Sequence, residues 1–263
     1  MARKLREKSG TGIYHVMLRG VNRMNIFEDS RDYYKFRDIL RQQVWPVDEL
    51  GRPLPSRCIV YAYCLMTNHV HLLIREGGEG LPDVMKRISV TYALYYNNKY
   101  EHVGHLFQNR YRSEPVNDNG YFFTLLRYIH QNPVAAGLST DAGSYPWSSW
   151  QEYLKTKVGI EPVICTVKHV LQHMSLDELS ELVNTPLPKM DGILECEETV
   201  LVRSDDEVSS FMVNTFGLRA PMDVQRITKE RRNDILRSTR LFGAGIRQLA
   251  RLTGIGVGVI RNL

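Results

Sequence analysis

The order of strand-like and helix-like segments in the first 132 residues is the feature that most restricts the fold. Strand-like segments are rich in β-branched and aromatic residues, and helix-like segments carry apolar residues at helical spacing. The first six segments follow the split β-α-β-β-α-β order of ferredoxin-like folds. The sequence therefore predicts an α+β protein with an antiparallel sheet, covered by helices on one face. We predict strands at 12–20, 57–66, 69–75 and 105–113, and helices at 33–44, 81–98 and 119–132.

The distribution of charge divides the chain into three regions. Residues 1–150 carry 19 basic against 14 acidic side chains, residues 151–220 carry 6 against 12, and residues 221–263 carry 9 against 3. A basic region favours a polyanionic partner, although a charge balance alone identifies none. The predicted organisation is a domain at 1–155, an acidic helical connector at 156–220 and a basic helical module at 221–263.

The composition argues against several classes of protein. Hydrophobic residues make up 43% of the chain, which is enough for a core, and no run of about 18 apolar residues predicts a membrane span. The N-terminus is basic, but no apolar signal segment follows it, so we expect a cytoplasmic protein. The cysteines form no C-x-x-C pair, which argues against a zinc knuckle or a disulfide framework. They are Cys58, Cys64, Cys165 and Cys196.

Two histidines alternate on the third predicted strand, in the string His69-Val70-His71. Alternate residues of a strand share a face, so both imidazoles are within reach of one metal ion. Two half-buried histidines without a ligand are the more common finding in such a position. The pattern alone leaves both interpretations open.

The helix before Pro133 carries a tyrosine and an asparagine on one face, because Tyr128 and Asn132 are four residues apart. A phenol and a carboxamide in this arrangement suit a nucleophile and a metal ligand. They equally suit an aromatic core residue and a polar residue at a helix end. Tyr121 is the alternative nucleophile, and His130 points to another side of the helix.

Five strings occur in a fixed order along the chain: YHVMLRGVNRMNIF, LMTNHVHLLI, GHLFQNRYRS, LLRYIHQNPVAAGL and YPWSSW. Together they resemble the REP-associated tyrosine transposases, a branch of the single-tyrosine HUH transposases, over about residues 10–155. The resemblance implies the HUH endonuclease fold, which is a ferredoxin-like sheet. It also implies an enzyme that cuts and rejoins single-stranded or hairpin DNA through a 5′-phosphotyrosine.

The resemblance assigns roles to four residues at matching positions. The HUH motif of the family, which is a histidine, a hydrophobic residue and a histidine, places its histidine pair at His69 and His71. The nucleophile falls on Tyr128 and a helical metal ligand on Asn132. Related insertion-sequence enzymes carry glutamine at the last of these positions, so the role of Asn132 departs from their pattern. The implied cofactor is Mg²⁺ or Mn²⁺, while ligand type alone also suits Zn²⁺. Such an ion would assist a tyrosine, whose ordinary pKa near 10 makes it a poor nucleophile at neutral pH.

Four arginines of the first domain are candidates for contact with DNA: Arg19, Arg23, Arg110 and Arg112. Arg110 and Arg112 alternate on the predicted strand, so both would face the same phosphate backbone. Solvated strand arginines are about as common. The matching strings favour Arg19 and Arg110.

The last region resembles a helix-turn-helix. Residues 246–255 suit its first helix and turn, since Ala250 permits close helix contact and Gly254 suits the turn. The second helix would begin at Val257, although flanking glycines weaken it. A generic helical hairpin is the alternative. The residues expected to contact DNA here are Arg247 and Arg251.

Two further functions fit parts of the sequence. The first is a non-catalytic helix-turn-helix DNA-binding regulator, and the second is an RNA-binding ferredoxin-like protein. The usual aromatic string of RNA-binding ferredoxin-like domains is absent, which disfavours the second. The sequence predicts no membrane partner, and it leaves open whether the protein is a monomer or a dimer.

Overall fold

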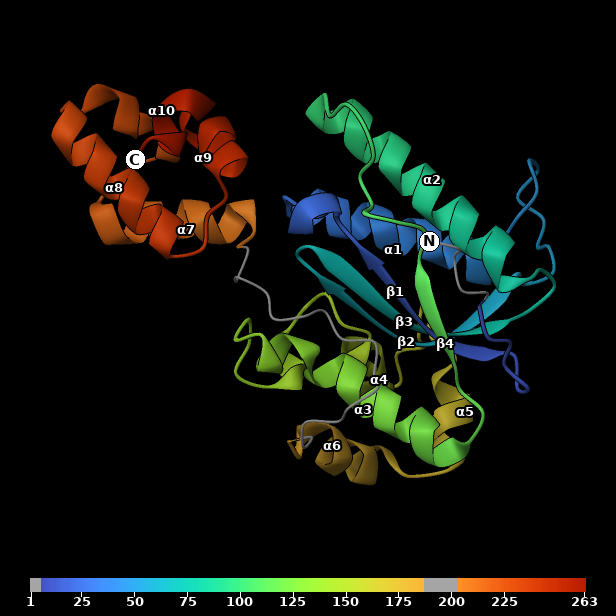
Figure 1. The fold of residues 1–263 in the computed structure, drawn as a ribbon. Helices are drawn as coiled ribbons and strands as arrows, with labels where there is room; N and C mark the ends of the chain where they lie inside the picture. Colours follow the sequence, from blue (N-terminus) through green and yellow to red (C-terminus); the bar gives the residue numbers. More distant parts are fainter. Residues whose placement is uncertain (1–5, 187–202) are drawn as a thin grey trace. The chain divides into compact units, whose positions relative to one another are not determined.

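The computed structural model describes residues 6–186 and 203–263, and its first unit is built on a four-stranded sheet (Figure 1). The strand order is β2-β3-β1-β4, and every neighbouring pair is antiparallel. This order and the sequence of elements along the chain confirm the predicted ferredoxin-like fold. The strands are β1 (Ile13–Arg19), β2 (Cys58–Met66), β3 (His69–Glu76) and β4 (Arg112–Pro115).

Helices cover both faces of this sheet, whereas the sequence predicted one covered face. Helices α1 (Ser30–Val44) and α2 (Leu81–Tyr100) lie on one face, and α3 (Asn119–Ala135) lies on the other (Figure 1). Phe36 of α1 and Tyr92 of α2 are fully buried and meet edge to face, with ring centroids 5.1 Å apart. The first face therefore holds an apolar core. The second face is covered by α3, and polar side chains can lie between this helix and the sheet.

The strand predicted at 105–113 is wrong for most of its length, because residues 105–111 form a loop and β4 begins only at Arg112. Strand β1 ends at Arg19, and Gly20 makes a single bridge to Phe107, so the loop has no long strand beside it. The ladder starts where Arg112 pairs with Met17. Leu106 is buried within the loop, which explains its strand-like pattern.

Pro133 does not end α3, as the sequence had predicted. The helix continues to Ala135, and the backbone N–H of Ala136 donates to the carbonyl of Asn132 at 3.0 Å. Proline lacks an N–H, so within the last turn it removes only one helical hydrogen bond. At the other end, the Asp118 side chain caps α3 by accepting from the backbone N–H of Tyr121 at 2.8 Å.

The YPWSSW string covers the edge of β2. The backbone N–H of Leu65 donates to the carbonyl of Trp147 at 3.0 Å, and that of Ser149 donates to the carbonyl of Tyr63 at 2.9 Å. An uncovered edge strand presents free backbone groups that can pair with another chain. The string is therefore a structural part of the sheet.

The chain divides into two compact units whose limits differ from the predicted domains. The first unit includes the helices of residues 156–184, which the sequence assigned to an acidic connector, while α7 (Asp205–Phe216) belongs to the second unit. Residues 187–202 of the predicted connector lie outside the described residues. The described residues of the first unit are 6–26 and 33–186, and those of the second are 27–32 and 203–263. The additional helices of the first unit are α4 (Trp150–Lys155), α5 (Val167–Leu171) and α6 (Leu176–Asn184).

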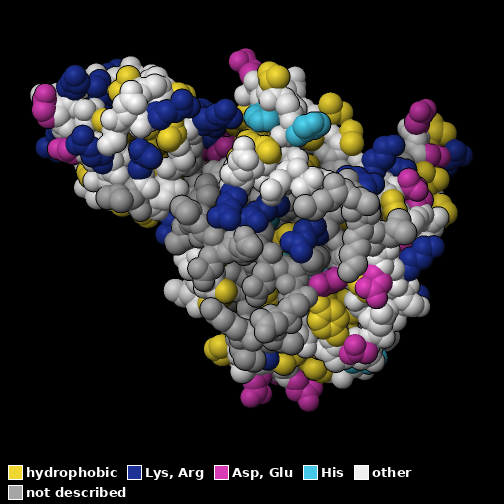
Figure 2. Space-filling model, in the orientation of Figure 1, with side chains coloured by type: hydrophobic (Ala, Val, Ile, Leu, Met, Phe, Trp, Pro, Cys, Tyr) yellow, Lys and Arg dark blue, Asp and Glu magenta, His cyan; other side chains and the backbone are white. Residues whose placement is uncertain are grey.

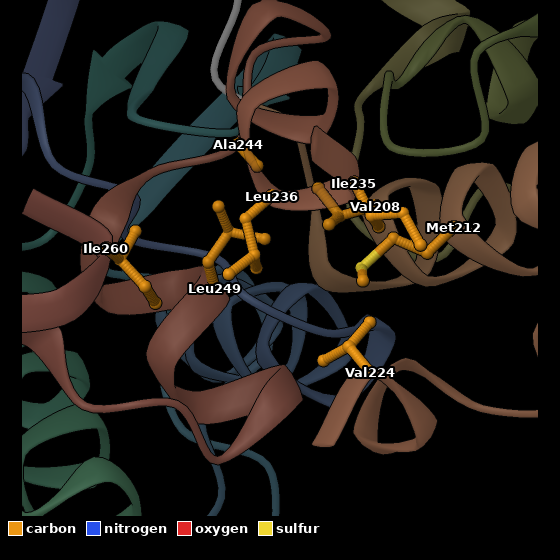
Figure 3. Close-up of a cluster of buried hydrophobic side chains, with 8 residues drawn as sticks. All are labelled: Val208, Met212, Val224, Ile235, Leu236, Ala244, Leu249 and Ile260. Carbon is orange, nitrogen blue, oxygen red and sulfur yellow. The ribbon is translucent and has the colours of Figure 1, made fainter. Parts of the chain in front are cut away.

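The second unit is helical and has its own apolar core (Figure 3). It contains α7, α8 (Lys229–Leu241), α9 (Ile246–Thr253) and α10 (Val257–Arg261). Gly254 ends α9 with a φ of 69°, a left-handed conformation that glycine adopts readily. The predicted helix, turn and second helix are therefore all formed. None of the helices in the described ranges is long and apolar enough to cross a membrane.

Candidate active site

Three histidines gather on the sheet face that α3 covers. His69 and His71 alternate on β3, and their ring centroids are 4.9 Å apart. His15 of β1 stacks on His71 with ring centroids 5.1 Å apart. All three are buried, with at most 2% of the residue exposed. The sheet therefore holds the three imidazoles as one rigid cluster.

The hydrogen bonds of His69 and His71 leave the same ring atom, Nε2, unpaired in each. His69 Nδ1 lies 2.7 Å from Asn68 Oδ1, so it donates, because a carbonyl oxygen only accepts. His71 Nδ1 lies 2.9 Å from His15 Nε2. Among the described residues, neither His69 Nε2 nor His71 Nε2 has a hydrogen-bond partner. A buried polar atom in this condition calls for a partner, which can be a water molecule or a ligand.

The environment keeps both imidazoles neutral near neutral pH. Burial, assisted by the positive charge of Arg19, lowers the pKa of His69 to about 4, while the Asn132 side chain acts in the opposite direction. Burial, with contributions from His69 and His15, lowers the pKa of His71 well below its usual value. Neutral imidazoles retain the lone pair that a metal ion requires.

Helix α3 brings Tyr128 and Asn132 to this cluster. The Tyr128 ring meets His71 edge to face at 5.5 Å between centroids and meets His15 similarly at 5.9 Å. Asn132 lies one turn later and interacts with His69, as its effect on the pKa of His69 requires. Its Nδ2 donates to the carbonyl of Tyr128 at 3.3 Å, which leaves Oδ1 as the atom available to a cation.

The donor set suits a divalent cation bound by nitrogen and amide oxygen. Two imidazole nitrogens lie there without a partner in the described chain, and the Asn132 carboxamide interacts with one of the rings; such mixed donors suit Mn²⁺ better than Mg²⁺. Within the described ranges, no cluster of three His, Cys, Asp or Glu residues could hold a metal. The third protein ligand would therefore have to be a group such as the Asn132 amide.

Tyr121, the alternative nucleophile, has a different environment. Its hydroxyl donates to Glu114 Oε1 at 2.7 Å. Burial, and then this hydrogen bond, raise the pKa of Tyr121 above its usual value. A phenol that is harder to deprotonate and already bonded to a carboxylate is a poor nucleophile.

Sequence reasoning missed two residues of the cluster, His15 and Glu114. Glu114 Oε1 lies 2.7 Å from His15 Nδ1, and the two residues face each other across β1 and β4. The strand pattern did carry one signal, since His15 and Arg19 are four residues apart on a predicted strand and must share a face.

The four arginines of the first unit differ in position. Arg19 pairs with His69 across β1 and β3, and its Nε and Nη2 are buried without a hydrogen-bond partner in the described part of the chain. Arg23, Arg110 and Arg112 are exposed. Arg110 precedes β4, so the expected alternation of Arg110 and Arg112 along one strand is not formed. Arg112 still shares the histidine face, because it pairs with Met17, which pairs with His71.

In the second unit the two predicted DNA contacts also separate. Arg247 is exposed on α9, whereas the Arg251 guanidinium lies 2.8 Å from carboxylate oxygens of Asp205 and Glu28. Arg251 therefore forms two ion pairs within its own unit, and its role in DNA binding stays a prediction. Figure 2 shows basic side chains on the surface of this unit. The exposed basic residues of this unit are Arg31, Arg219, Arg226, Lys229, Arg231, Arg237, Arg240, Arg247, Arg251 and Arg261.

Comparison with known proteins gives two findings. Residues 9–132 match the family described as "Transposase IS200 like". A solved structure of a REP-associated tyrosine transposase bound to a REP hairpin aligns with a TM-score of 0.47 and 15% sequence identity, covering 62% of this chain and 90% of that chain. A search of curated proteins returns no match.

Proposed function

Residues 9–132 form a transposase domain of the IS200-like family, and from this premise we propose that the protein cuts and rejoins single-stranded or hairpin DNA. One observation carries the proposal. The Tyr128 ring stands against His71 and His15, beside two imidazole nitrogens that have no partner in residues 6–186 and 203–263. The candidate nucleophile therefore lies next to two nitrogens that could bind a metal ion.

The metal ligands in this proposal are His69 Nε2, His71 Nε2 and Asn132 Oδ1, and the cation is Mg²⁺ or Mn²⁺. When bound, such an ion supplies Lewis acidity toward the nonbridging oxygens of a phosphodiester. Three protein ligands leave coordination positions for the scissile phosphate. The two unpaired Nε2 atoms support the assignment, because a buried acceptor without a partner is costly unless a ligand fills it.

Tyr128 is the nucleophile. Its Oη attacks phosphorus, a P–O bond to tyrosine forms, and the P–O3′ bond breaks. The 5′ end remains attached as a phosphotyrosine, and the 3′ oxygen leaves with a proton as a free 3′-OH. The phenolic proton is released to solvent. Rejoining is the reverse attack by a 3′-OH, and it needs no ATP because the covalent bond conserves the energy of the original linkage.

Arg19 is the residue best suited to hold the scissile phosphate. Its unpaired, buried Nε and Nη2 lie beside His69, and a guanidinium binds phosphate through two parallel hydrogen bonds. Arg23, Arg110 and Arg112 are exposed and would contact the DNA backbone outside the site. These contacts would position the strand without reading its sequence.

A Tyr128→Phe substitution tests the nucleophile. We expect it to abolish covalent protein–DNA adducts while DNA binding persists, because the change removes a single oxygen. The measurement is a denaturing gel after incubation of a single-stranded DNA hairpin library with Mn²⁺. Tyr121→Phe is the matched control and should still form adducts. Adducts that persist in Tyr128→Phe would refute the assignment.

The second unit supports a second activity, binding of duplex DNA. The observation that favours it is the α9–turn–α10 arrangement together with the exposed arginines. In the full chain, Arg247→Ala should weaken duplex binding and leave adduct formation on hairpins unchanged. Specific duplex binding without cleavage at any metal concentration would instead favour the non-catalytic regulator. Cleavage of a matched RNA hairpin in preference to DNA would favour the RNA-binding alternative.

A further inference from the structure

We propose that His15 and Glu114 are positioning residues that fix the ring and the tautomer of the metal ligand His71. The inference rests on the proposed function, which makes His71 a ligand. It adds two residues that neither the sequence patterns nor the family match single out. Both act through His71 rather than on DNA.

The three residues form a hydrogen-bonded chain across the sheet. Glu114 of β4 stands opposite His15 of β1, and His15 lies two residues from Met17, which stands opposite His71 of β3. Glu114 Oε1 to His15 Nδ1 is 2.7 Å, and His15 Nε2 to His71 Nδ1 is 2.9 Å. The strands thus set the distances, and no flexible loop takes part.

The direction of the protons in this chain decides whether His71 can bind a metal. A carboxylate only accepts, so His15 donates from Nδ1. A metal ion on His71 Nε2 requires the ring proton of His71 to lie on Nδ1, and His15 Nε2 is the atom placed to accept it. His71 then donates from Nδ1 and keeps a lone pair on Nε2. The opposite tautomer of His71 would carry a proton on Nε2, which blocks metal binding and buries an N–H without a partner.

The two rings in the hydrogen-bonded series of Glu114, His15 and His71 are buried, so this series determines the tautomer of His71 without competition from solvent. His15 and His71 are both fully buried, so in the folded protein each ring meets its partner and no bulk solvent. His15 also touches the Tyr128 ring, so it supports the nucleophile and the ligand together. His69 has a simpler arrangement. Asn68 Oδ1 accepts from His69 Nδ1, and Asn68 Nδ2 donates to the carbonyl of Arg23 at 3.3 Å.

The first test measures Mn²⁺ affinity by calorimetry on the metal-free, full-length protein without DNA. Losing an orienting partner of a ligand histidine weakens metal affinity by about 10-fold to 100-fold. We expect this loss for His15→Phe and Glu114→Ala. Glu114→Gln should restore most of the affinity, because its amide oxygen still accepts from His15. Tyr121→Phe should bind Mn²⁺ nearly as well as the wild type, since it leaves Glu114 bonded to His15.

The second test needs no substitution and so does not depend on a variant folding. The ¹⁵N chemical shifts of the histidine rings in the metal-free wild type report each tautomer, and we expect a proton on Nδ1 of His71. A proton on Nε2 would overturn the proposal. So would folded His15→Phe and Glu114→Ala variants that bind Mn²⁺ as tightly as the wild type, or a wild type that binds none. Tight Mn²⁺ binding without DNA adducts would refute the proposed function and leave this inference standing.

Discussion

Glu152 and the pair of His69 and His71 are buried polar groups of the same unit, but their surroundings differ. Glu152 Oε2 accepts from the backbone N–H groups of three consecutive residues, at 2.8 to 3.0 Å, and Oε1 accepts from the Tyr63 hydroxyl at 3.0 Å. The three residues are Val163, Ile164 and Cys165. In the histidine pair, one ring nitrogen of each residue is unpaired within the described chain.

The difference separates structure from function. A buried polar group whose bonds are all made stabilises one arrangement of the chain. A buried polar group with an unmade bond costs free energy, and such groups occur at functional or strained sites. Glu152 therefore ties the segment after α4 to β2, whereas the proposed metal would bind at the two unpaired histidine nitrogens.

The largest expected effect is at the satisfied site. Glu152→Ala would leave three backbone N–H groups, two of them buried, and the Tyr63 hydroxyl without their acceptor, and we expect the free energy of unfolding to fall by about 3–5 kcal/mol. Urea unfolding followed by circular dichroism measures this. Glu152→Gln keeps one oxygen acceptor and should lose less. A decrease below about 1 kcal/mol for the alanine variant would contradict the comparison.

The converse effect is expected at the unsatisfied site. Mn²⁺ at 100 times its dissociation constant should raise the free energy of unfolding by about 2.7 kcal/mol, because the folded state alone offers the site. The gain should vanish in His69→Ala, which removes one ligand. His169→Ala changes a half-buried histidine of α5 outside the cluster and should keep the gain. Equal stabilisation of all three proteins would place the metal elsewhere.

The pairing of candidate site residues on one strand face and on one helix face could be predicted from the sequence, because both patterns are local. The period of two in a strand places His69 and His71 on one face, and the spacing of four in a helix places Tyr128 and Asn132 together. The roles themselves came from the family resemblance. The prediction of one covered sheet face was wrong, because α3 covers the face opposite α1 and α2 (Figure 1).

The remaining features depend on pairings between distant parts of the chain. Glu114 meets His15 only through the register of β1 and β4, and a shift of one residue would turn either side chain to the other face. The ion pairs of Arg251 were not predicted, because its partners Asp205 and Glu28 lie far from it in the sequence. Local patterns contain no information about either pairing.

The pH dependence of stability gives a smaller effect with a definite sign. The pKa of His69 is about 4 in the folded protein against 6.5 as the ordinary value. Below pH 6.5 the unfolded state therefore binds a proton that the folded state does not, so stability falls as the pH falls toward 4. For His69 alone we expect a decrease of about 2 kcal/mol between pH 7 and pH 5, without metal. Urea unfolding at both values measures it, and His69→Gln should show a correspondingly smaller decrease.

The smallest expected effect concerns Arg112, which shares the face of the histidines but is exposed. An exposed arginine gains little from a single phosphate, so Arg112→Gln should weaken binding of a single-stranded hairpin only a few-fold. The informative readout is the salt dependence. For each phosphate that the variant no longer neutralises, the slope of log affinity against log salt should decrease in magnitude by about 0.7 on single-stranded DNA. Arg52 is the matched control, since it is exposed in another loop and bonded to Asp48 at 2.6 Å. If Arg52→Gln lowered the slope as much as Arg112→Gln, the effect would come from overall charge, and the DNA path would not follow the histidine face.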